Sequence, residues 1–373
     1  MKLQIFHRQI KEYWIDLIFF IFVSMLIYLP KPFYSNQNQY FVHIVSNVNP
    51  SLKNDWLVNT KDTNQFFTWL FTPFFKFFGV NGIQYGTYIF FIISLIAIYQ
   101  FIETFYESRQ IARSVILSIG LLQSPVISYL FKDSSLQDIF TPFKGFGGQY
   151  LFLRSGYLQP AVGGVFLLFG IVCLFRDKKW FAFFLSLTSC SIHPSLIFST
   201  LMLAILYFFV QYKKKMHSGS KCFTYYLFFA IILFCVTLLS NNNLILLFDT
   251  SASEKIALKR FAFERIPHHT LISNWPKDDL LMLFIWLVAI SLVSRVPKEA
   301  HLKYILITTL TVSLITAIIV QITRNTALAL LFPWRISGVL APIIYGIVLG
   351  NFFKRFRKEK QIIWTGFLFS LVI

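Results

Sequence analysis

Charged residues are scarce in this sequence: only 13% of its 373 residues are Asp, Glu, Lys or Arg. A soluble globular domain carries roughly a quarter of such residues, so the composition excludes an ordinary soluble protein. Hydrophobic residues reach 56%, aromatic residues reach 19%, and the mean hydropathy is +0.63. The sequence therefore predicts an integral membrane protein, with many of its aromatic side chains facing lipid.

Cysteine is also scarce, and its four residues lie in or beside apolar segments: Cys173, Cys190, Cys222 and Cys235. None of them forms a CxxC pair, so their spacing indicates neither a zinc site nor a disulfide framework. We expect these side chains to behave as small buried hydrophobic groups.

Common catalytic signatures are missing as well. The glycine-rich stretch Lys144–Gln149 lacks the GxxxxGK[ST] order of a P-loop, and its glycines predict a tight turn instead. Neither a GxSxG nor an HExxH motif occurs. Next to His268 and His269 there is no further ligand at regular spacing, so the sequence does not support a divalent metal and leaves the cofactor open.

Apolar runs of about the length that crosses a bilayer, roughly 17–25 residues, recur along the whole chain. We expect an all-α polytopic membrane protein with about 10–11 transmembrane helices in a single domain, 1–373, without a separate soluble part. The candidate spans are 14–30, 83–102, 112–131, 160–175, 180–193, 195–212, 223–240, 279–294, 304–321, 328–351 and an incomplete 362–373.

Basic residues lie in short runs between these apolar segments. The net charge of +18 would suggest a nucleic-acid partner in a soluble protein, but no stretch is long and polar enough to form a basic domain. If the N-terminus is cytoplasmic, six short inner segments hold 20 of the 34 Lys and Arg residues, as the positive-inside rule expects. Frequent Lys, Asn, Ile and Phe are typical of an AT-rich bacterial genome. The sequence thus predicts a multi-pass protein of the bacterial inner (plasma) membrane that does not bind nucleic acid.

Three long segments then fall on the outer, extracytoplasmic side: 31–82, 132–159 and 241–278. The first contains Phe66–Phe78, thirteen aromatic-rich residues with one charge and an internal Pro73. This stretch is short for a span, so we expect it to form interfacial helix.

Residues 180–212 are short for two crossings, although both ends are basic. Two short helices that meet at Ser191–Pro194 would explain both facts. Their apex would lie below the outer surface, where irregular backbone is tolerated only beside protein or a water-filled cavity. We therefore expect an outward-facing cavity at this apex.

Polar residues on the predicted outer side are expected to converge on this cavity. Arg335 lies seven residues inside the predicted helix 328–351, which is about 10 Å deep, and a charge at that depth indicates a functional position. Its guanidinium suits a phosphate group. Asp55 is a candidate general base, metal ligand or helix cap. Further candidate ligands of a substrate or its phosphate are Arg154, His193, Arg265, His268, His269 and Arg324.

This layout resembles the GT-C superfamily of membrane glycosyltransferases, and more narrowly a set of bacterial membrane proteins similar to it. The likeness rests on the first helix 14–30, the outer loop with Asn54-Asp55-Trp56 and the aromatic segment 66–78. The phrases Arg265-x-Pro267-His268-His269, His193-Pro194 and Pro333-Trp334-Arg335 also look like that group. The first loop departs from the better-known members because it carries a lone Asp and not a pair of acids.

The resemblance implies that a sugar is transferred from a polyprenyl-phosphate-linked donor to a glycan or lipid acceptor on the extracytoplasmic face. By that resemblance, Asp55 would activate the acceptor or help to hold a metal, and Arg335, with Arg265 or Arg324, would neutralise the phosphate leaving group. His268 and His269 would contact sugar or phosphate. Membrane lipid, donor and acceptor would be the partners.

Two alternative classes stay open. A lipid-linked oligosaccharide transporter or flippase would share the basic cavity but would not require a base. An O-antigen polymerase or ligase also combines many spans with a large outer loop and arginines.

Overall fold

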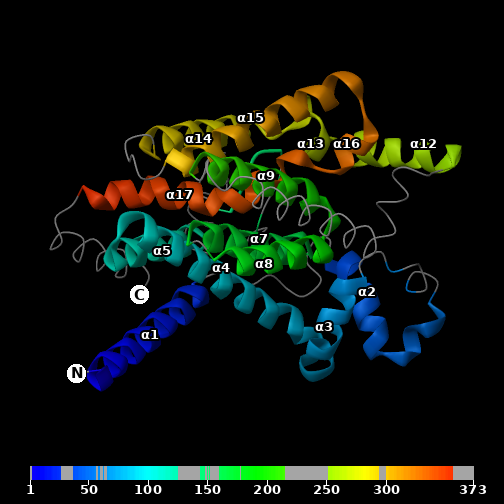
Figure 1. The fold of residues 1–373 in the computed structure, drawn as a ribbon. Helices are drawn as coiled ribbons and strands as arrows, with labels where there is room; N and C mark the ends of the chain where they lie inside the picture. The colour runs from blue at the N-terminus through cyan, green and yellow to red at the C-terminus, as the bar shows by residue number, and fades with distance from the viewer. Residues whose placement is uncertain are drawn as a thin grey trace.

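Helices make up the regular structure of the part of the chain that can be described (Figure 1), and no strand occurs in it. The computed structural model describes residues 2–26, 37–55, 58, 62, 65–124, 143–147, 149, 151, 159–176, 178–214, 251–293 and 300–355. The elements, in chain order, are α1 (Lys2–Met25), α2 (Gln37–Val48), η1 (Pro50–Asn54), α3 (Gln65–Phe78), η2 (Gly79–Asn81), α4 (Gly82–Tyr106), α5 (Arg109–Leu122), α7 (Gln159–Phe175), α8 (Lys179–Ile192), η3 (Pro194–Leu196), α9 (Ile197–Lys214), α12 (Ala252–Arg260), η4 (Phe261–Arg265), α13 (Pro267–Thr270), η5 (Ile272–Asn274), α14 (Asp279–Val293), α15 (Ala300–Thr323), α16 (Thr326–Leu330), η7 (Pro333–Arg335) and α17 (Ile336–Lys354).

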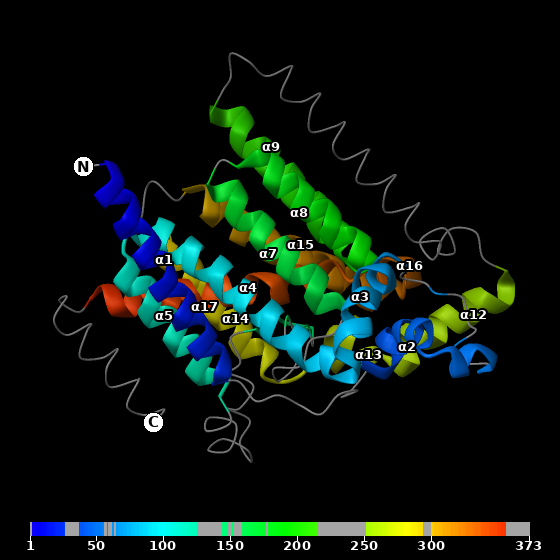
Figure 2. The ribbon, with the colours of Figure 1, turned by 90° about the horizontal axis from the view of Figure 1, so that it is seen from below.

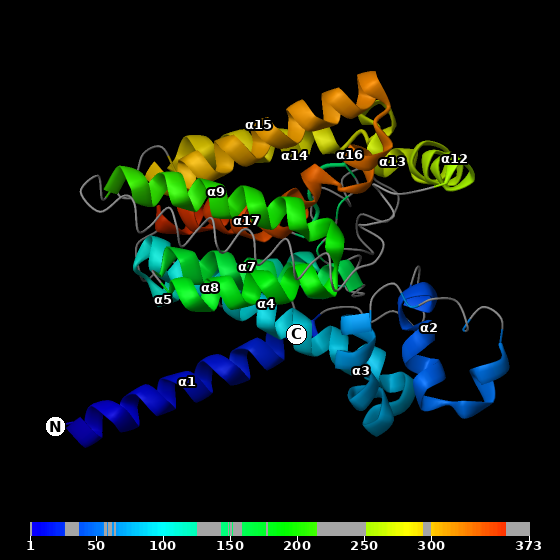
Figure 3. The ribbon, with the colours of Figure 1, turned by 45° about the vertical axis from the view of Figure 1, so that its right-hand side comes forward.

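Helix α17 lies at the centre of the molecule. Figure 3 shows α14 and α15 on one side of it and α4, α5, α7 and α8 on the other, and α17 contacts helices of both groups. Its side chains are buried continuously from Ile336 to Ile347. Because neighbours surround it, this helix is apolar all round, as expected for a buried helix.

Helices α1, α2 and α3 lie on the outside of this arrangement. Figure 2 shows α1 crossing α4 and α5 obliquely, and the helix contacts both. Helix α2 packs against α3 through the ring of Phe41, which lies 5.5 Å from the rings of Phe67 and Phe75. The predicted segment Phe66–Phe78 is helical, since it lies within α3. Its place at a membrane interface stays a prediction.

Within the described residues, three helical stretches are long and apolar enough to cross a membrane: Gln65–Tyr106, Leu302–Thr323 and Thr326–Lys354. Helix α14 is shorter but apolar on both faces, because buried Met282 and Trp286 alternate with exposed Leu280 and Phe284. Exposed apolar faces of this kind are compatible with a lipid environment. The larger number of crossings and their orientation stay predictions, and the predicted spans 223–240 and 362–373 lie outside the described residues.

The two short helices expected in 180–212 are confirmed, since α8 ends at Ile192 and α9 begins at Ile197. The candidate span Thr326–Lys354 matches the span predicted over 328–351, but the helix within it is interrupted. The chain leaves the helix after Leu330 because Phe332 has a φ of +46° and Pro333 has no N–H to donate. Arg335 is thus the residue before α17, not a residue seven positions inside a helix.

The predicted burial of cysteine is confirmed for Cys173 and Cys190, which are free thiols. Cys222 and Cys235 lie outside the described residues.

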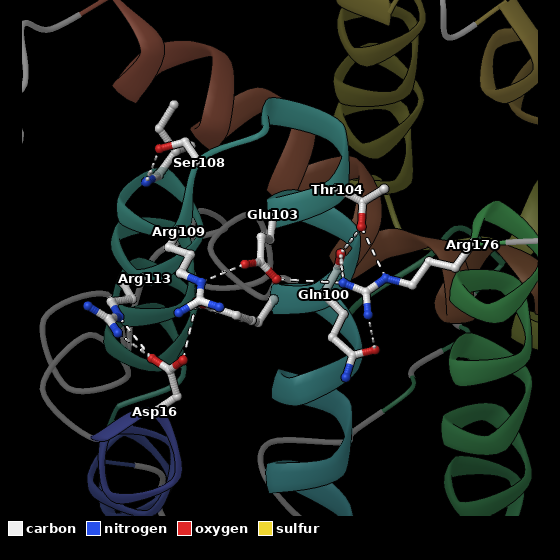
Figure 4. A network of polar contacts seen from close by, with 10 residues as sticks. Asp16, Gln100, Glu103, Thr104, Ser108, Arg109, Arg113 and Arg176 are labelled. Carbon is white, nitrogen blue, oxygen red and sulfur yellow. Dashed lines mark hydrogen bonds and ion pairs between the residues drawn. The ribbon is translucent and has the colours of Figure 1, made fainter. Parts of the chain in front are cut away.

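Helix ends gather at two opposite ends of the molecule (Figure 1). At one end, which we call the α5 end, arginines pair with acids from neighbouring helices (Figure 4). Arg113 lies 2.6 Å from Asp16, Arg109 lies 2.9 Å from Glu103, and Arg176 lies 3.6 Å from the same carboxylate. At the other end, which we call the α13 end, α13 contacts η4, η5 and α15, and Trp334 of η7 donates to its backbone. The candidate site lies there.

Candidate functional site

The guanidinium of Arg335 is the centre of the candidate site. The η7 turn places it, half-buried, directly before α17. Its Nε donates to Oε1 of Gln149 at 2.9 Å, and one terminal nitrogen donates to Oγ of Ser195. Its carbon Cζ lies 4.4 Å from the centre of the Phe332 ring, in cation–π geometry. Each of these contacts orients the guanidinium without adding a negative charge.

The α8–α9 apex supplies the second side of the site. Ser195 donates its backbone N–H to Nδ1 of His193 at 3.3 Å, and its Oγ lies 2.6 Å from the same nitrogen. Arg335 also approaches this nitrogen, at 3.4 Å. A backbone N–H and a guanidinium can only donate, so Nδ1 of His193 is an acceptor without a proton. The apex predicted from sequence therefore does meet Arg335, whereas an outward-facing cavity stays a prediction.

Helix α13 supplies the third side. Nδ1 of His269 lies 3.4 Å from the carbonyl oxygen of Gly147, which can only accept, so this nitrogen carries the proton. Burial, with smaller contributions from His268 and Arg335, lowers the pKa of His269 to about 4. The ring is thus neutral near pH 7, with Nε2 unprotonated. Trp334 Nε1 donates to the backbone oxygen of His269 at 2.9 Å and fixes α13 against η7.

His268 lies beside this histidine on the outside of α13. Its side chain is exposed, and the two imidazole centres are 4.1 Å apart. The side chains do not diverge, as neighbouring residues usually would, and their ring planes are tilted by 46° to one another.

A tight turn forms the fourth side of the site. Backbone bonds from Gly145 to Gln149 and from Leu151 to Phe143 close it, at 2.7 and 2.8 Å. Gly147 has a φ of +70°, which explains the glycine there. The turn predicted for this glycine-rich stretch is confirmed for the residues described, and its Gln149 side chain holds Arg335.

Beneath the turn lies a buried ion cluster. Lys144, which is fully buried, forms an ion pair with Asp278, and its Nζ lies 3.6 Å from Asp279. Oδ2 of Asp279 accepts the Gly147 N–H at 2.6 Å. The acids belong to the start of α14, where the sequence Asp278-Asp279 before an apolar run is typical of helix capping.

Three of the predicted residues that the structure describes do not join Arg335. Arg265 and Arg324 are exposed and lie over the rings of Phe261 and Phe263, at 5.8 and 5.7 Å. Asp55 is exposed at the end of η1, where it accepts the Val58 N–H at 3.3 Å. Figures 1 and 3 show α2, which leads into η1, apart from α13 and α16. Arg154 lies outside the described residues.

Among the site residues, the sequence-based prediction gave no role to Ser195, Asp278 and Asp279. Ser195 follows the predicted apex and could have been found from it. The others act through partners more than a hundred residues away, which no local pattern indicates.

Among the described residues, no group of three or more His, Cys, Asp and Glu side chains is placed to hold a metal ion. Comparison with protein-family models, curated protein sequences and solved structures finds no match to this chain.

Proposed function

We propose that this chain is a membrane glycosyltransferase that moves a sugar from a polyprenyl-phosphate donor to a hydroxyl acceptor at its α13 end. The observation that carries the proposal is the half-buried guanidinium of Arg335, oriented by Gln149, Ser195 and Phe332. Preorganised donors of this kind stabilise a charge that develops during a reaction by several kcal/mol. A guanidinium also matches the geometry of phosphate oxygens.

The chemical step follows from these charges. The acceptor oxygen forms a bond to the anomeric carbon, and the bond from that carbon to the phosphate oxygen breaks. The electron pair stays on the phosphate, where Arg335 stabilises it. The acceptor proton passes to a base, for which the chain offers two candidates. Asp55 is implied by the family resemblance, and Nε2 of His269 is unprotonated near pH 7.

Translocation of a lipid-linked sugar is the second candidate function, and the position of Asp55 favours it. This carboxylate is exposed, and α2 and η1 lie apart from the Arg335 site (Figure 3). A transporter needs the phosphate-binding cation but no base.

The experiment uses the full chain in nanodiscs and in vesicles, with a panel of polyprenyl-phosphate hexoses and pentoses. Release of polyprenyl phosphate reports transfer to an added glycan or lipid acceptor, or to water, and accessibility of the labelled sugar reports translocation. Wild type is compared with Arg335→Gln, Asp55→Asn and His269→Asn.

Release that Arg335→Gln abolishes supports the transferase, and the variant that also lacks release identifies the base. Translocation without release would replace the transferase with the transporter. If Arg335→Gln leaves both activities and donor binding unchanged, the proposed function is wrong.

A further inference from the structure

The buried ion cluster of Lys144, Asp278 and Asp279 has no part in the proposed chemistry, and its burial calls for an explanation. The Lys144 side chain is 0% exposed, and the two carboxylates are 14% and 4% exposed. Burying three charges costs several kcal/mol per ion before any pairing energy is regained. Apolar side chains of similar size would fill this space at lower cost, so the cluster suggests a requirement for polar geometry.

The cluster contacts the turn that contains Gly147 directly. Asp279 holds the backbone N–H of Gly147 at 2.6 Å, a short charge-assisted hydrogen bond. The other side of the turn is fixed by Ser337 of α17, whose Oγ accepts the Phe146 N–H at 3.1 Å. A Cβ atom at Gly145 would overlap Ser337 and the backbone of Gly338, so the turn lies directly against α17.

Hydrogen bonds connect the turn to two side chains of the candidate site, Gln149 and His269. The carbonyl oxygen of Gly147 accepts Nε2 of Gln149 at 3.0 Å and lies 3.4 Å from Nδ1 of His269. Gln149 then presents Oε1 to Arg335. Gly147 therefore links the ion cluster, through its N–H, to the site residues, through its carbonyl oxygen.

We propose that Asp279 and Lys144 are positioning residues that fix Gln149, and through it Arg335, in the orientation that binds a lipid phosphate. This inference rests on the proposed function, since it assumes that Arg335 meets a phosphate. Asp279 holds the turn, and Lys144, whose Nζ lies 3.6 Å from the Asp279 carboxylate, holds that carboxylate in place. Gln149 connects the turn to the guanidinium, because its side chain bonds to Gly147 and to Arg335.

The test measures binding to the full chain in nanodiscs, with polyprenyl monophosphate and the uncharged polyprenol of equal length as probes. Asp279→Leu removes the acceptor of the Gly147 N–H, whereas Asp279→Asn keeps an acceptor oxygen. Gln149→Leu cuts the contact with Arg335 and leaves the ion cluster intact, so it tests the link even if Asp279→Leu accumulates poorly. Asp16→Asn, at the α5 end, is the matched control.

Asp279→Leu and Gln149→Leu are each expected to weaken phosphate-lipid binding by about tenfold, the value of one hydrogen bond to a charged group. Polyprenol binding should not change. Asp279→Asn should recover most of the preference for phosphate, and Asp16→Asn should keep all of it.

Three results separate the hypotheses. If both leucine variants keep the full preference for phosphate while Arg335→Gln loses it, the positioning role is wrong and the proposed function stands. If they weaken both lipids equally, their effect is on folding, which also overturns the positioning role. If Arg335→Gln itself keeps the preference, the proposed function is wrong.

Discussion

The two ends of the molecule treat arginine in opposite ways. At the α5 end, Arg113 and Arg109 form ion pairs with Asp16 and Glu103, so each guanidinium has a carboxylate as its counter-ion (Figure 4). At the α13 end, Arg335 contacts an amide, a hydroxyl and an aromatic ring. An ion pair satisfies the charge of an arginine within the protein, whereas contacts with an amide, a hydroxyl and a ring fix the orientation of the guanidinium.

Carboxylates are not lacking at the α13 end, which makes the difference informative. Asp278 and Asp279 lie there but pair with Lys144 and with a backbone amide. The acids thus hold the ammonium and the turn, whereas an amide, a hydroxyl and a ring contact the guanidinium.

The largest expected effect is a loss of stability. It is tested by replacing one closely packed glycine at each end of the molecule. Gly145→Ala would drive a Cβ into Ser337 and the backbone of Gly338, and Gly350→Ala would drive one into the ring of Tyr106. A ring can rotate aside but helix backbone cannot, so we expect Gly145→Ala to destabilise by about 3 kcal/mol or more and Gly350→Ala by about 1 kcal/mol. Thermal unfolding in detergent measures both. Equal losses would show that the α17 backbone does not constrain the turn.

The second effect tests the charges of the two ends directly. Arg335→Gln is expected to weaken binding of polyprenyl phosphate about 100-fold, because it removes a charge and its paired hydrogen bonds. Arg335→Lys should lose about tenfold, since an ammonium keeps the charge but not the planar fork. Arg113→Gln, the control at the α5 end, should bind within about twofold of wild type. A comparable loss in Arg113→Gln would mean that the two ends do not differ in this way.

The third effect is a dependence of stability on pH that belongs to the α13 end. Burial lowers the pKa of His269 to about 4 from an ordinary value of 6.5. The unfolded chain therefore takes up a proton first, so the stabilising contribution is complete above pH 6.5 and is lost as the pH falls to about 4. We expect a loss of about 2 kcal/mol over this interval.

Unfolding temperatures of wild type and His269→Gln between pH 7.5 and 4, in steps of roughly half a unit, measure this contribution. The variant should show a flatter profile. An identical slope in both proteins would place the acid sensitivity elsewhere in the chain.

How far the sequence predicts this structure depends on whether a feature is set by neighbouring residues in the chain or by contacts between distant ones. The apex at His193-Pro194 and the turn at Lys144–Gln149 follow from proline and glycine at fixed positions, and both are found. The break before Arg335 does not follow from the span predicted over 328–351, because a positive φ such as the +46° of Phe332 is uncommon for a bulky residue.

Convergence of the candidate ligands was predictable only in part. Arg335 meets His193 because each lies at a proline-marked break between two helices, Pro194 directly after His193 and Pro333 two residues before Arg335. Asp55 was grouped with them on topology alone, which assigns a side of the membrane but no lateral position. Gln149 could not be identified, since its partner lies 186 residues away along the chain.

The smallest expected effect concerns the ion pair between α1 and α5. Asp16→Asn removes the counter-ion of Arg113, whose side chain is 35% exposed, so water can solvate the guanidinium that is left. We therefore expect a loss of only about 1 kcal/mol in unfolding free energy, against the several kcal/mol typical of a broken buried pair. Removal of one acid from the Lys144 cluster, in Asp278→Asn, should cost more because Lys144 is fully buried. Denaturation of both variants in the same detergent, with and without about 0.5 M salt, gives the comparison, and only Asp16→Asn should approach wild type as salt rises. If the two losses are equal, burial does not distinguish the structural charges of the two ends, and the contrast between them rests on Arg335 alone.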